Sequence, residues 1–196
     1  MTKELTDAEK KELAQRIARS VERAPFRDKF FDLECFSLPF YNNAYDVHVK
    51  CFTTRPVITK EYICDDARVF ETDGEEETLA EINKALNLKL TADNAAAYVA
   101  FYFQKVAVGD GFARLIFSAK DVTDDGFNEE LAENLKALIV APEIRPVSDG
   151  FAVSGFVLSG ETLFKAQMSL RPDGTLSIDE EEIVYDDLPV RRVMLR

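Results

Sequence analysis

The feature that most constrains the fold is an alternating segment. Residues 162–170 read TLFKAQMSL, in which apolar and polar side chains alternate from Phe164 onward. One face would carry Phe164, Ala166, Met168 and Leu170, and the other Lys165, Gln167, Ser169 and Arg171. Because successive side chains of a strand point to opposite faces, the pattern predicts a sheet with one buried face and one solvent-exposed face.

A hairpin turn follows this segment. Residues 171–174 read RPDG, and such a turn is favoured because Pro presets φ while Gly accepts a positive φ. Residues 151–158 and 175–185 have strand composition on either side. We therefore predict that the three segments form an antiparallel meander.

An uncharged segment predicts a helix buried against that sheet. Residues 95–103 carry no charge, so the helix would be apolar on all sides. Tyr98 and Tyr102 lie four residues apart, so their hydroxyls share one side and need polar surroundings. The segment ETDGEEETLAEINKALNL, residues 71–88, predicts a further helix with an acidic first turn and an apolar stripe, and another helix is predicted near residues 127–139.

One more helix is predicted at the N-terminus. Thr6 and Glu9 form a capping box, and a narrow apolar stripe follows until an Ala-Pro pair at residues 24–25. We therefore predict an N-terminal amphipathic helix over residues 1–24. Residues 25–196 are predicted to form one α+β domain, in which helices pack on a curved, mainly antiparallel sheet.

The only histidine, His48, lies three residues before Cys51 in the segment YDVHVKCF, residues 45–52. β-branched and aromatic residues favour a strand here. A strand places His48 on a solvent-facing side and Cys51 on the opposite, apolar side. Cys35 and Cys64 lack zinc-knuckle spacing, which disfavours a Cys₃His site. We therefore expect no metal ion, and three thiols in the core.

Charge and missing motifs exclude several classes of function. The formal net charge of the 196 residues is -12, which disfavours binding to nucleic acid and to anionic membrane surfaces. No apolar run reaches the roughly 18 residues of a membrane span, and the first residues lack the apolar core of a secretory signal. Phosphate-binding, dinucleotide-binding and complete calcium-binding loops are missing. The sequence therefore predicts a cytoplasmic protein without a cofactor.

Residues 25–41 are unusually rich in aromatic side chains and have two interpretations. They could form a strap over one end of the sheet. Alternatively, Phe30, Phe31 and Phe36 could contribute an exposed contact to a protein partner or to a second copy of the chain, giving a homodimer. Neighbouring Phe30 and Phe31 cannot both face inward in regular structure.

Two segments resemble those of a family of uncharacterised bacterial proteins. They are LTADNAAAYVAFYFQKVAVGDGF, residues 90–112, and ETLFKAQMSLRPDGTLSIDEEEIVYDDLPV, residues 161–190. The resemblance implies no activity and no functional residue. The order of elements also resembles cystatin-like and nuclear-transport-factor-2-like folds, which implies an α+β architecture alone, because such scaffolds host enzymes and binding proteins alike.

Two functions from different classes are left open. The first, which is favoured, is a non-catalytic module that binds a protein or a small apolar ligand, because catalytic motifs are missing and aromatic residues are in excess. The second is a small pocket enzyme of the nuclear-transport-factor-2-like type, using Asp93, Tyr98 and Tyr102 for proton transfer or hydrolysis. Convergence of these side chains on a shared cavity would favour the enzyme. Their placement in packed core or in solvent would favour the binding module.

Overall fold

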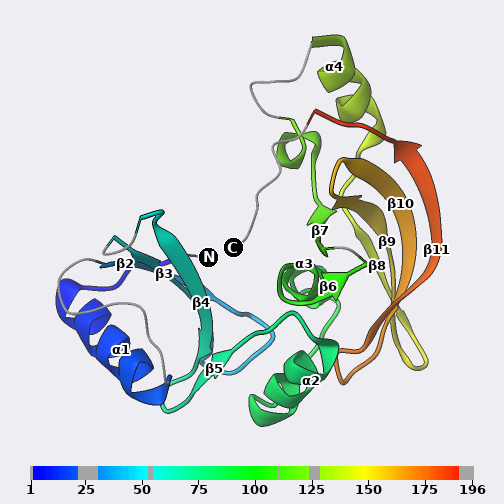
Figure 1. Ribbon diagram of the computed structural model, residues 1–196. Helices are drawn as coiled ribbons and strands as arrows, with labels where there is room; N and C mark the ends of the chain where they lie inside the picture. Colours follow the sequence, from blue (N-terminus) through cyan, green and yellow to red (C-terminus); the bar gives the residue numbers. More distant parts are fainter. Residues whose placement is uncertain (1, 22–30, 53–54, 110, 124–128, 190–196) are drawn as a thin grey trace.

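The computed structural model describes residues 2–21, 31–52, 55–109, 111–123 and 129–189, which form two antiparallel sheets with four α-helices (Figure 1). The first sheet runs, in spatial order, β1 (Thr2–Lys3), β2 (Phe31–Ser37), β3 (Tyr45–Cys51), β4 (Ile58–Cys64) and β5 (Val69–Glu71). The second runs β11 (Leu176–Tyr185), β10 (Thr162–Leu170), β9 (Gly150–Ser159), β7 (Gly111–Ile116) and β6 (Ala107–Val108), and β8 (Glu143–Val147) also pairs with β9. The helices are α1 (Asp7–Ser20), α2 (Glu76–Ala85), α3 (Ala95–Lys105) and α4 (Glu129–Leu138), with a 3₁₀ turn at Ala119–Asp121. Among the residues described, no helix combines the length and apolar character needed to cross a membrane.

The predicted meander is formed by β9, β10 and β11, which belong to a sheet that curls into half of a barrel (Figure 1). On the face of β10 predicted to be buried, Ala166, Met168 and Leu170 are each 1% exposed. The hairpin turn closes where the N–H of Arg171 donates to the carbonyl of Thr175 at 2.9 Å. The α+β class and the meander are therefore confirmed, and the arrangement is consistent with the cystatin-like and nuclear-transport-factor-2-like class.

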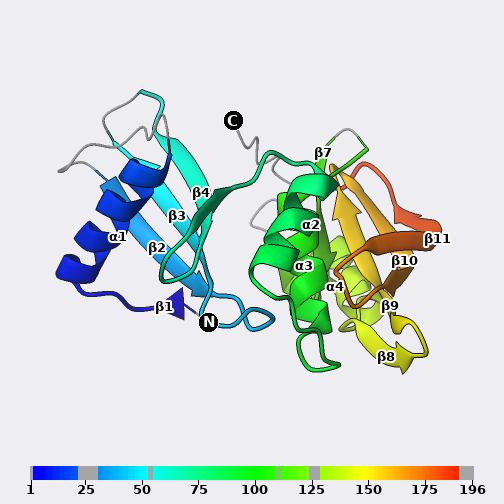
Figure 2. The same cartoon turned by 90° about the horizontal axis from the view of Figure 1, so that it is seen from below.

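Helix α3 lies between the two sheets, inside the curl of the second (Figures 1 and 2). The side chains of Tyr98, Val99 and Phe103 are fully buried, as the absence of charge along the helix predicted. On the side of the first sheet, α3 meets the loop between β2 and β3, whose Phe40 and Tyr41 belong to the same buried cluster. One apolar core therefore extends from this loop through α3 to the second sheet.

Helix α1 packs on the face of the first sheet that points away from α3 (Figure 1). Ile17 is fully buried there against Val47 and Val49 of β3. The predicted capping box is present, because the hydroxyl of Thr6 accepts from the N–H of Glu9 at 3.4 Å and the Glu9 carboxylate accepts from the N–H of Thr6 at 2.8 Å. Thr6 and Glu9, whose spacing predicted the start of this helix, therefore cap it in the structure.

Strand β3 confirms the predicted separation of His48 and Cys51 onto opposite faces. Cys35, Cys51 and Cys64 form no disulfide and are buried in the cluster under α1. Burial raises the pKa of Cys64 to about 12, so this thiol stays protonated at neutral pH. The sequence predicts that the face of β3 carrying His48 is exposed to solvent. This is wrong at Asp46, which lies two residues away on the same face and is only 4% exposed. Asp46 is buried because the end of α3 covers that part of the sheet.

The aromatic segment is divided among several environments. Residues 22–30, and with them Phe30, lie outside the described residues. Phe31 is half-buried against the cluster under α1. Phe36 is also half-buried, on the opposite face of β2, with its ring centroid 4.9 Å from that of His48. The two described candidates for a partner contact therefore do not form one surface.

Candidate functional site

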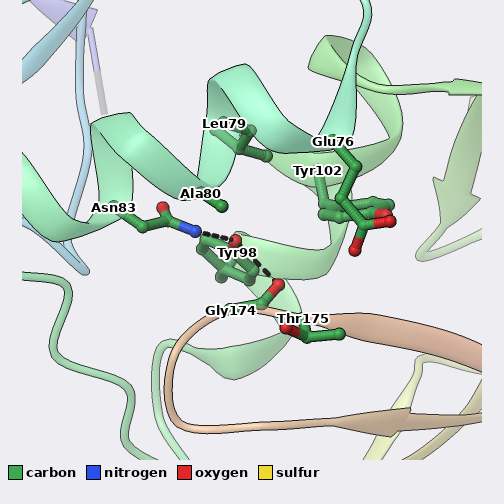
Figure 3. Close-up of a pocket in the computed structure, with 8 residues that line it drawn as sticks. All are labelled: Glu76, Leu79, Ala80, Asn83, Tyr98, Tyr102, Gly174 and Thr175. Carbon is green, nitrogen blue, oxygen red and sulfur yellow. Dashed lines mark hydrogen bonds between the residues drawn. The ribbon is translucent and has the colours of Figure 1, made fainter.

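The two tyrosines singled out in the sequence meet at a small cavity between α2, α3 and the turn before β11 (Figure 3). Their spacing puts Tyr98 and Tyr102 on the side of α3 that faces α2, and Glu76 and Asn83 of α2 complete the polar lining. Asp93, the third residue predicted for catalysis, is exposed and does not line the cavity. The structure therefore brings the tyrosines together and leaves Asp93 apart.

A chain of hydrogen bonds fixes the hydroxyl of Tyr98 (Figure 3). The hydroxyl donates to the carbonyl of Gly174 at 2.9 Å and accepts from Nδ2 of Asn83 at 2.7 Å. Oδ1 of Asn83 accepts in turn from the hydroxyl of Tyr41. A side chain at Gly174 would not fit, because its Cβ would lie 2.2 Å from Oη of Tyr98. The network is satisfied within the protein, and it ties the β10–β11 turn to α2 and α3.

This cavity is too small for a substrate. Its volume is about 10 Å³, roughly what one water molecule requires and far below the roughly 300–1,000 Å³ of ligand pockets. Burial, and then the charge of Glu76, raise the pKa of Tyr102 to about 12, and burial also raises the pKa of Tyr98. At neutral pH these phenols are protonated and cannot act as bases. Tyr98 and Tyr102 are thus packed around a cavity of about one water molecule, and Asp93 is exposed away from it.

A second polar cluster lies where α3 reaches the first sheet. Lys105, the last residue of α3, is 2% exposed. Its Nζ lies 2.9 Å from both carboxylate oxygens of Asp46 and 2.6 Å from Oε2 of Glu61. Nε2 of His48 lies 3.1 Å from Oδ2 of Asp46 and 3.8 Å from Oε1 of Glu61. One helix end thus meets three charged or titratable side chains from β3 and β4.

Opposite charges in this cluster shift the pKa values of its members. Burial by itself would raise the pKa of Asp46, but hydrogen bonds and charges from His48 and Lys105 hold it below its usual value. Burial by itself would lower the pKa of His48, but Asp46 and Glu61 raise it above its usual value. Asp46 is therefore ionised at neutral pH, and Lys105 supplies the pairing that a buried carboxylate needs.

A wide groove, with a volume of about 490 Å³, lies between the two terminal strands of the second sheet. Val108 of β6 and Leu176 and Ile178 of β11 supply apolar side chains to it. Its rim includes the exposed carboxylates of residues 75–77, which lie at the start of α2. The groove therefore combines a few apolar side chains with a mainly polar lining that is acidic along one side, and it is far larger than the tyrosine cavity.

Comparison of the chain with models of protein families, with curated proteins and with solved structures found no match. The geometry of the described residues is therefore the basis for assigning a function.

Proposed function

We propose that the chain is a non-catalytic binding module, and that the groove between β6 and β11 receives an extended segment of a partner protein. The segment would carry an apolar side chain flanked by Lys or Arg. The observation that carries this proposal is the contrast in size between the two cavities. The groove, at about 490 Å³, has room for side chains of a partner, whereas the tyrosine cavity holds about one water molecule.

The form of the partner follows from the strands that border the groove. In the part of the chain that the structure describes, β6 and β11 end the second sheet on its two sides. A terminal strand offers backbone N–H and C=O groups to an added strand, and side-chain pockets then supply specificity. The ten-residue β11 is the strand that would do so, because in the short β6 the N–H of Ala107 already donates to the carbonyl of Gly74 at 2.9 Å. Val108 and Ile178 would contact the apolar side chain of such a segment. An extended peptide therefore suits the groove better than a compact ligand.

The charge of the partner follows from the rim. Glu75, Glu76 and Glu77 are exposed beside the groove, and the chain as a whole carries a net charge of -12. Both favour a basic partner and disfavour an acidic one. A second copy of this chain is a poor occupant for the same reason, because two such charges repel. Basic side chains at the rim would speed association and fix the register of the segment.

The proposal predicts binding of a fluorescent heptapeptide that alternates lysine and valine. We expect saturable binding in fluorescence anisotropy, weakening as salt rises and screens the rim charges. The double variant Glu76→Gln/Glu77→Gln should lose about tenfold in affinity at low salt, since each exposed charge pair contributes up to about 1 kcal/mol. Ile178→Asp should lose at least about tenfold, because it places a charge on an apolar contact.

The matched control is Glu129→Gln/Glu130→Gln. These two glutamates lie in the first turn of α4, as Glu76 and Glu77 lie in the first turn of α2. Both double variants therefore remove the same charge and the same favourable interaction with a helix dipole. The control should bind the peptide like the unmodified protein. Equal losses in both would mean that the peptide responds only to net charge, and the groove would be excluded as the site.

A further inference from the structure

We propose that Asp46, His48 and Glu61 form a binding site for a divalent transition-metal ion. One ligand atom from each side chain can be chosen so that all three lie within 4.8 Å of one another. The sequence led us to expect no metal because Cys51 faces away from His48, and the structure confirms that separation. Instead of a cysteine, the structure places the carboxylates of Asp46 and Glu61 beside His48.

The register of the first sheet builds this arrangement. Asp46 and His48 are two residues apart on β3, so their side chains leave the same face of the strand. Glu61 of β4 is the residue directly opposite His48 in the antiparallel pair. Directly paired residues have Cβ atoms about 4.5–5.5 Å apart, close enough for both side chains to reach one ion. The site is therefore held by two hydrogen-bonded strands.

The distances suit one ion bound by an imidazole and two carboxylates. Nε2 of His48 lies 3.1 Å from Oδ2 of Asp46 and 3.8 Å from Oε1 of Glu61. Two ligands that are each about 2.0–2.2 Å from a metal ion lie about 2.8–3.6 Å apart at angles of about 90–110°. The His48–Asp46 distance is within this range, and Glu61 at 3.8 Å would have to move a few tenths of an ångström closer. A mixed nitrogen and oxygen set suits ions such as Zn²⁺, Fe²⁺ or Co²⁺. The His48 and Glu61 side chains are 25% and 26% exposed, so water can reach the remaining coordination positions.

Lys105 would act from outside the ligand set. Its ammonium bonds to Oε2 of Glu61, which leaves Oε1 of Glu61 for the ion. It also lies 2.9 Å from both oxygens of Asp46, so the ion would share the Oδ2 atom of Asp46 with Lys105. Groups that hold carboxylate ligands from behind fix their orientation toward a metal. Its positive charge also opposes a second cation. The two carboxylates outweigh that charge, and the net charge of -12 favours cations near the protein.

The test uses the full chain after treatment with a chelator and dialysis, titrated with Zn²⁺ by calorimetry and with Co²⁺ by visible absorption. We expect one ion per chain, Co²⁺ bands typical of nitrogen and oxygen ligands, and a rise in melting temperature on adding Zn²⁺. His48→Asn and Glu61→Gln should each lower the affinity at least about tenfold, the usual effect of disturbing a metal ligand or its support.

The matched control is Glu34→Gln. Glu34 lies directly opposite His48 on the other neighbouring strand, β2, and pairs with Lys50 at 3.2 Å instead of joining the cluster. It should bind Zn²⁺ and Co²⁺ like the unmodified chain and show the same rise in melting temperature. No saturable uptake would mean that Lys105 is the only cation the cluster holds. Uptake unchanged in His48→Asn would place the ion elsewhere. Either result would overturn the proposal.

Discussion

Replacing Phe101 with alanine is expected to lower the free energy of unfolding by about 3–5 kcal/mol, the usual cost of truncating a buried phenylalanine. Phe101 is 4% exposed in the middle of α3. Its ring packs against those of Phe40, Tyr41 and Tyr98, with centroid distances of 5.1, 6.3 and 6.4 Å. The loop between β2 and β3 and helix α3 would both lose contacts around the cavity left behind.

Urea unfolding followed by circular dichroism measures this change. Phe117→Ala serves as the control, because the Phe117 side chain is 42% exposed and its loss should cost less than about 1 kcal/mol. A loss below about 1 kcal/mol for Phe101→Ala would contradict the placement of α3 in the core between the two sheets.

Lys105→Met is expected to destabilise the chain by a similar amount, about 3–5 kcal/mol, because it removes one partner of a buried ion pair. The Asp46 side chain, 5% exposed, would keep its charge without the ammonium 2.9 Å away. His48 would remain beside it as the one titratable cation of the cluster. A buried carboxylate that loses its strongest partner must either stay charged at high cost or take up a proton.

Two comparisons isolate the effect of burial in the urea experiment. Lys136→Met removes a pair with the same 2.6 Å distance as Lys105 and Glu61, but both partners are more than half exposed. It should cost less than about 1 kcal/mol. The double variant Lys105→Met/Asp46→Asn should recover much of the lost stability, since it removes the buried carboxylate charge as well, and Glu61, which loses the same ammonium, is 26% exposed. Equal effects of the two lysine variants would contradict the ion-paired junction between α3 and the first sheet.

The fold could be predicted where one side of an element is uniformly buried. The face of β10 with Ala166 and Met168 packs on the core, and therefore its polarity alternates with the period of a strand. Helix α3 is buried on most sides, and therefore residues 95–103 lack charge. In β10 the side chains repeat with the period of a strand, whereas in α3 the lack of a charged side was the informative signal.

Strand β2 shows how such a signal is lost. Phe31, Leu33 and Cys35 face the cluster under α1, and Asp32 and Glu34 alternate with them. The alternation was readable but is interrupted at Phe36, an aromatic residue on the polar face. The structure explains the exception, because the Phe36 ring packs beside His48. The aromatic richness of the segment therefore hid a strand pattern that was present.

The junction at Lys105 could be predicted only in part. The sequence indicated that Asp46 and His48 share a face of one strand, and they do. It could not indicate that Lys105, 59 residues after Asp46, ends a helix on that face. A lysine that closes an otherwise uncharged helix was the one available signal, because such a charge needs a partner when it is buried.

The groove was not predictable from local patterns. The glutamates at residues 75–77 were predicted to lie at the start of a helix, which they do. Their position beside β6 and β11 depends on how far the second sheet curls. Curvature accumulates from the twist of every strand pair, and no single segment carries it. The tyrosine cavity is similar, since spacing predicted that Tyr98 and Tyr102 share a side but not how tightly that side is packed.

The most direct test of the proposed function is a map of amide chemical shifts on the ¹⁵N-labelled protein during titration with the lysine–valine heptapeptide. Binding in the groove predicts that the largest shift changes lie in residues 74–77, 106–109 and 176–178, which border it. They should saturate together with one dissociation constant. Largest changes on α4 or on the α1 face of the first sheet, or no saturable change at all, would contradict the claim that the chain works by binding a basic segment between β6 and β11.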